Sequence, residues 1–103
     1  MIEFEIENNS SFAYEVMLFA SSAKIRFYGK NYKTNPEDYV IIKNIIYNDL
    51  ILPELFEYTT MTTDSDNPIY QNLTNVNYIS FNGMWELKFT ENDIKKILNK
   101  KLT

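Results

Sequence analysis

Cysteine and histidine are both absent from this chain of 103 residues. Without cysteine, the chain has no disulfides, no thiolate ligands for zinc and no thiol nucleophile. Without histidine, it lacks the usual general base of enzymes and the most common metal ligand. Only two glycines are present, too few for the glycine-rich loops that bind nucleotide phosphates. These absences predict that the chain is not an enzyme and holds no cofactor or metal.

Basic residues are also scarce. Ten Lys and Arg residues face 14 Asp and Glu residues, so the formal net charge is −4, and Arg26 is the single arginine. Proteins that bind duplex DNA need a dense basic face, so we expect no direct binding of duplex DNA. No apolar run is long enough to cross a membrane, and the first residues are acidic where a signal peptide would be basic. We therefore expect no membrane partner and place the protein in the cytoplasm of its producer or host.

Apolar residues make up 45% of the chain and aromatic residues 16%. A chain of this length and composition can bury a core of its own, which predicts a single domain over residues 1–103. Residues 2–7 alternate strictly between apolar and acidic side chains, as a half-buried strand does. Residues 24–29 alternate in the same way and predict a second strand.

The dipeptide Asn82-Gly83 lies between two apolar segments, 76–81 and 84–89. Asn-Gly is the strongest short-range signal for a β-hairpin, because both residues accept positive φ. The hairpin fixes a register in which the second strand faces the core through Trp85, Leu87 and Phe89. Its other face carries Ile79, Phe81 and Met84 around the tip.

Helices are expected at 36–49 and 91–101. Asn35 before Pro36 is a typical helix start, and the apolar residues that follow have helical spacing. Thr90 and Asp93 resemble a capping box at the start of the second helix. Pro53 ends the first helix and opens a short one through Tyr58.

Two further segments are less regular. Residues 12–20 favour a short buried helix through their Ala, Met, Leu and Glu residues, and a strand paired in a hairpin with residues 2–7 is the alternative. Residues 59–75 are polar and predict a long loop with a brief ordered piece at Ile69-Tyr70. The resulting fold class is α+β: a small, mostly antiparallel sheet with a C-terminal hairpin, packed by two or three helices.

Binding candidates lie in three places. Ile79, Phe81 and Met84 form either an apolar contact patch or a second core face covered by a helix. Tyr32 and Tyr70 fall in polar loops, and exposed tyrosines are favoured at protein interfaces. A row of three acids faces outward from the first strand and forms either a site for a basic partner or a solvated strand face: Glu3, Glu5 and Glu7.

Glu86 and Lys88 form the one pattern that suggests catalysis. An acid and a lysine two apart on a strand are typical of metal-dependent nucleases, in which the acid binds Mg²⁺. Such a site needs a second acid on the neighbouring strand, but the predicted register places Asn77 and Ile79 there. A charged pair on an exposed strand face is therefore the favoured interpretation.

These observations lead to three hypotheses. The favoured one is a non-enzymatic protein-binding module that acts as a small inhibitor or accessory protein of a phage or mobile element, for example as an anti-defence protein of the anti-CRISPR kind. Its partner is another protein, for instance a nucleic-acid enzyme, and a homodimer stays open. The alternatives are an immunity protein or antitoxin that neutralises a toxin, and a metal-dependent nuclease that uses Glu86 and Lys88.

Overall fold

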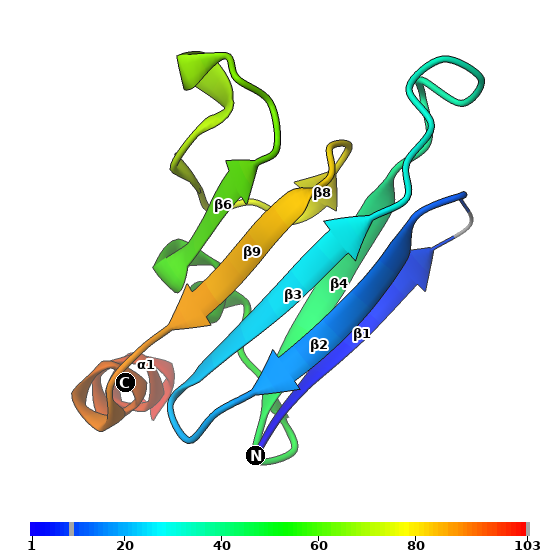
Figure 1. The fold of residues 1–103 in the computed structure, drawn as a ribbon. Helices are drawn as coiled ribbons and strands as arrows, with labels where there is room; N and C mark the ends of the chain where they lie inside the picture. Colours follow the sequence, from blue (N-terminus) through cyan, green and yellow to red (C-terminus); the bar gives the residue numbers. More distant parts are fainter. Residues whose placement is uncertain (9, 103) are drawn as a thin grey trace.

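The computed structural model describes residues 1–8 and 10–102, which form two antiparallel sheets packed face to face (Figure 1). Sheet A contains β1 (Ile2–Asn8), β4 (Val40–Tyr47), β5 (Leu50–Ile51) and β8 (Tyr78–Ile79). Sheet B contains, in spatial order, β2 (Ala13–Leu18), β3 (Ser22–Tyr28), β9 (Gly83–Lys88), β6 (Thr59–Thr63) and β7 (Leu73–Thr74). Each sheet covers the apolar face of the other, so the fold is a sandwich.

One α-helix is present in the described part of the chain. This helix, α1 (Glu91–Leu102), lies at one end of the sandwich beside the last residues of β9 (Figure 1). Its start is the predicted capping box: the Thr90 N–H donates to Asp93 Oδ2 at 2.8 Å, and the Asp93 N–H donates to Thr90 Oγ1 at 3.1 Å. Two short 3₁₀ helices, η1 (Pro53–Tyr58) and η2 (Pro68–Tyr70), complete the elements. None of these described helices is long and apolar enough to cross a membrane.

The core lies between the two sheets. Trp85 is fully buried at its centre, and Phe4 of the opposite sheet packs edge-on against it with ring centroids 5.3 Å apart. The indole N–H of Trp85 donates to the carbonyl of Val76 at 2.9 Å, which satisfies its one polar atom. As predicted, Trp85, Leu87 and Phe89 face this core.

The predicted packing of a sheet by two or three helices is wrong, and the largest error is the helix at 36–49. Residues 40–47 form β4, the strand of sheet A that pairs with β1, β5 and β8. A β-bulge near Lys43 shifts the register with β1, so Ile42 and Ile45 both face the core. The resulting three-residue spacing imitates a helix, although the β-branched residues of this segment favour a strand.

Turns flank β4 at both ends. The Asp38 N–H donates to the carbonyl of Asn35 at 3.3 Å, so the expected helix start is a single turn. After β4, Asn48 and Asp49 have φ values of 47° and 67° and connect Tyr47 to its partner in β5. Two consecutive residues with positive φ form the tight hairpin loop that suits two twisted strands.

Residues 12–20 and 59–75 were also predicted wrongly. The first segment contains β2, which is a strand but pairs with β3 and not with β1. The second contains β6, which lies between β9 and β7, and its brief ordered piece is η2. Thr59, Met61 and Thr63 of β6 are buried, so threonine serves here as a β-branched core residue and not as a loop residue.

The predicted hairpin around Asn82-Gly83 does not form. The segment before it, β8, pairs with β4 in sheet A, whereas β9 begins at Gly83 in sheet B. Asn82 joins separate segments: its N–H donates to the Tyr32 hydroxyl at 2.7 Å, its Oδ1 accepts from the Lys30 N–H at 3.0 Å, and its carbonyl accepts from the Asp64 N–H at 2.8 Å. The dipeptide therefore carries the chain from one sheet to the other.

Candidate interaction site

The residues predicted at the hairpin tip lie in different environments. Ile79 is buried at 1% exposure, and Met84 lies on the outer face of sheet B beside its neighbours Arg26 and Thr62. Phe81 is half-buried between two tyrosine rings. These three predicted residues therefore do not share one surface.

The predicted loop tyrosines, by contrast, meet at Phe81. The ring centroids of Tyr32 and Tyr70 lie 5.8 Å and 4.7 Å from that of Phe81. Lys30 also contacts this cluster, because its Nζ lies 5.2 Å from the Tyr32 ring centroid. Its Nζ also donates to the carbonyls of Ser80 at 2.6 Å and of Asp38 at 2.9 Å, and burial lowers the pKa of this lysine. These contacts hold the segments of Tyr32, Tyr70 and Phe81 against one another.

Glu86 and Lys88 lie on the outer face of sheet B. In the ladder the neighbours of Glu86 are Lys24 on β3 and Thr60 on β6, and the Lys24 Nζ lies 3.7 Å from its carboxylate. No second acid faces it, and no group of three acidic residues in the described part of the chain could hold a metal ion. The geometry is that of a charged pair on a strand face.

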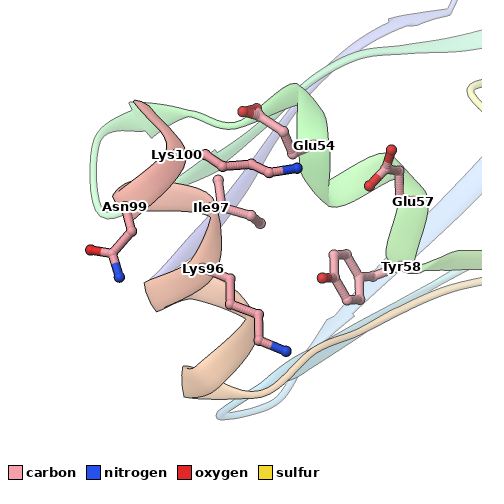
Figure 2. A pocket seen from close by; sticks show the side chains of 7 residues that line it. All are labelled: Glu54, Glu57, Tyr58, Lys96, Ile97, Asn99 and Lys100. Carbon is pink, nitrogen blue, oxygen red and sulfur yellow. The ribbon is translucent and has the colours of Figure 1, made fainter. Parts of the chain in front are cut away.

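A groove of about 520 Å³ separates α1 from η1. Figure 2 shows Lys96 and Lys100 pointing from α1 across this groove toward η1, which supplies Glu54 and Tyr58. The Lys101 Nζ pairs with the Glu54 carboxylate at 3.0 Å. Burial raises the pKa of the Tyr58 hydroxyl, and nearby acids add to the rise. Opposite charges on the two walls attract one another and hold α1 against η1.

A different border of the sandwich is incomplete. The inward side chains of β3 are fully buried: Ala23, Ile25 and Phe27. Their direct neighbours on β2 also point inward, but they are 53%, 38% and 38% exposed: Leu18, Val16 and Tyr14. No described strand therefore covers the core beyond β2, the last strand of sheet B.

The strand that faces this border from the other sheet is β1. Figure 1 shows β1 and β2 side by side, one from each sheet, and a groove of about 450 Å³ lies between them. The groove is lined by Ile2, Glu3, Phe4, Ile6, Tyr14, Val16 and Leu18. We call this region, the inward side chains of β1 and β2 with the groove between them, the open edge.

Backbone groups of β2 also face outward at the open edge. In the described residues β2 pairs with β3 alone, and the Phe19 N–H donates to the carbonyl of Ser22 at 2.9 Å just beyond this ladder. Every second residue of an antiparallel pair bonds to its neighbour, so the odd-numbered residues of β2 bond to β3. The backbone N–H and C=O groups of Tyr14, Val16 and Leu18 then point away from the sheet, and the same three residues carry the exposed apolar side chains.

The remaining sheet edges are protected against pairing. Edges formed by β5, β7 and β8 are two residues long. The other long edge strand, β1, carries three exposed carboxylates: Glu3, Glu5 and Glu7. Short edges and charged edges both discourage the addition of another strand. Among the described strands, β2 is the long edge with an apolar, unprotected inner face.

The two strands that border the open edge carry charge of one sign, and it lies on their outward faces. β1 and β2 together carry four glutamates and no basic residue. Glu5 is engaged by Asn44 at 3.0 Å and by Lys43 at 3.9 Å. For Glu3, Glu7 and Glu15, no cation of the described residues lies within ion-pair distance. The open edge is thus an apolar groove with acidic borders.

The sequence predicted the acidic row of β1 but not the exposed apolar side chains of β2. The acidic row on β1 was predicted by strict alternation. Tyr14, Val16 and Leu18 also alternate, which is the signal for a strand, but the helix-forming residues between them outweighed it in the prediction. Comparison with protein-family models, curated proteins and solved structures finds no match to this chain.

Proposed function

We propose that this chain is a non-enzymatic protein-binding module that engages its partner through the open edge. The observation that carries the proposal is the exposure of Tyr14, Val16 and Leu18, which continue the core but lack a cover. Exposed apolar side chains beside an unpaired strand edge are costly in water and promote association. A partner that covers them completes both the core and the sheet.

The proposal gives the protein the role of a small inhibitor or accessory protein of a phage or mobile element, working in the cytoplasm of its producer or host. A chain that acts by covering a surface of its target needs neither histidine nor cysteine. The acidic open edge supports a basic target, such as an enzyme that handles nucleic acid.

The test compares two leucine variants. Leu18→Asp places a carboxylate in the open edge, whereas Leu102→Asp makes the same change at a leucine that is 85% exposed at the end of α1. Each protein is immobilised and used for affinity purification from a bacterial lysate. We expect wild type and Leu102→Asp to retain the same proteins and Leu18→Asp to lose them. Identical sets from all three proteins would contradict the proposal.

A further inference from the structure

We infer that the open edge binds an extended basic segment of another protein, which adds as a new strand to β2. This inference rests on the proposed function and specifies how the partner is recognised. Strand addition is a common mode of peptide recognition, in which backbone hydrogen bonds give affinity and alternate side chains give specificity.

The backbone of β2 offers outward-pointing hydrogen-bonding groups to such a strand. Outward-pointing N–H and C=O groups recur at Tyr14, Val16 and Leu18, at the two-residue interval with which a neighbouring strand offers its own groups. The ladder between β2 and β3 keeps a constant register over six residues, so no bulge interrupts this edge. An added strand would become the sixth strand of sheet B, whose order is β2-β3-β9-β6-β7.

Side chains of the added strand would meet two environments. Those on its inner side would enter the groove between β1 and β2, where Phe4 and Ile6 form the opposite wall, so apolar residues fit there. Those on its outer side would lie beside Glu15, whose ladder partner Arg26 is paired with Asp64 at 3.5 Å, so lysine or arginine fits there. The preferred segment therefore alternates apolar and basic residues.

Charge argues against a second copy of this chain as the occupant. Pairing β2 with its own copy would place Glu15 of both chains on the same outer face, with no basic residue in either copy of β2 to offset them. Each chain also carries a net charge of −4. Like charges across an edge oppose pairing, whereas a basic segment is attracted to it.

Synthetic octapeptides test this inference directly. One alternates lysine and valine, a second replaces every lysine by glutamate, and a third keeps the lysines but has proline in place of one central valine. Binding is measured by calorimetry, and the contact site by protection of β2 amides from hydrogen exchange. We expect the lysine–valine peptide to bind about tenfold more tightly than either control. Its affinity should fall as salt rises from about 0.05 to 0.5 M.

A pair of protein variants locates the binding edge. Val16→Pro removes an outward N–H and leaves the ladder to β3 intact, whereas Val16→Thr keeps the N–H and the branched shape. We expect the proline variant to lose binding by about tenfold and the threonine variant to bind as wild type does. If Val16→Pro does not fold, the proline-containing peptide tests the same pairing, because it lacks one backbone N–H of the added strand.

Several outcomes would overturn the inference. These are equal binding of the lysine and glutamate peptides, tolerance of proline in the peptide, protection of amides outside β2, and a dimer of this chain that forms through β2. Each of them leaves the proposed function standing if Leu18→Asp still loses its captured proteins. Conversely, capture that is insensitive to Leu18→Asp refutes the proposed function, whatever the peptides do.

Discussion

Gly83 and Gly29, the two glycines of the chain, test the strand arrangement directly. In the sandwich, Gly83 lies between β3 and β6, where its partners are Phe27 and Thr63. A Cβ atom added at Gly83 would lie 2.4 Å from the carbonyl oxygen of Thr62. At Gly29 the nearest heavy atom would be 3.9 Å away, and the difficulty is only its φ of +81°. Alanine at these two positions therefore perturbs the fold for different reasons.

The cost of Gly83→Ala follows from this contact. Unbonded atoms prefer separations of about 3.5–4.0 Å, so β6 would have to move by about 1 Å. Overpacking of this kind costs about 1–3 kcal/mol, and a strained ladder hydrogen bond adds about 1 kcal/mol. We expect Gly83→Ala to lower the free energy of unfolding by about 2–4 kcal/mol. Gly29→Ala should lower it by about 1–2 kcal/mol, the cost of a left-handed conformation.

Urea denaturation of wild type and both variants measures these changes. The single tryptophan of the chain, Trp85, is fully buried and reports unfolding by its fluorescence. In a hairpin turn, Gly83 would need only positive φ, and its replacement would cost about as much as that of Gly29. Equal destabilisation by the two substitutions would therefore refute the placement of Gly83 between two strands.

Three other substitutions test the core, a buried cation and the helix cap. Trp85→Phe leaves the carbonyl of Val76 without its donor and should cost about 2–3 kcal/mol, measured by thermal unfolding with circular dichroism; a cost below about 1 kcal/mol would contradict this contact. Lys30→Met removes two hydrogen bonds from a buried ammonium to backbone carbonyls and should lower the free energy of unfolding by about 2 kcal/mol in urea; no change would show that these bonds are not formed. Hydrogen bonds from the backbone and hydroxyl of Thr90 hold the pKa of Asp93 below its ordinary 3.8. The ionised carboxylate therefore stabilises the fold above pH 3.8. This contribution is lost as the pH falls through the lowered pKa. Asp93→Asn should thus flatten the decline of the melting temperature below about pH 4, and an unchanged pH profile would argue against the cap.

Elements with local signals were predictable. Residues 2–7 alternate because β1 has one face on the core and one in water, and α1 begins at a capping box that involves only Thr90 and Asp93. Such signals depend on neighbours in sequence, so they do not require knowledge of the fold. The acidic row on β1 was found for this reason.

Elements decided by distant contacts were not predictable in this way. The bulge near Lys43 is part of the pairing between β4 and β1, and it gives the core residues of β4 a spacing that resembles a helix. Asn82-Gly83 has the sequence of a hairpin turn, yet its flanking strands belong to different sheets: β8 pairs with β4, and β9 pairs with β6. Local propensity loses where burial against distant strands contributes more.

The sequence by itself determined that histidine and cysteine are missing, that the net charge is −4 and that β1 carries an acidic row. It also determined which residues of β1, β3 and α1 face the core. Only the tertiary structure decided which strands pair, and therefore that β2 ends its sheet with Tyr14, Val16 and Leu18 uncovered. The physical reason is that alternation states which face of a strand is apolar, whereas exposure depends on whether another strand lies beside it.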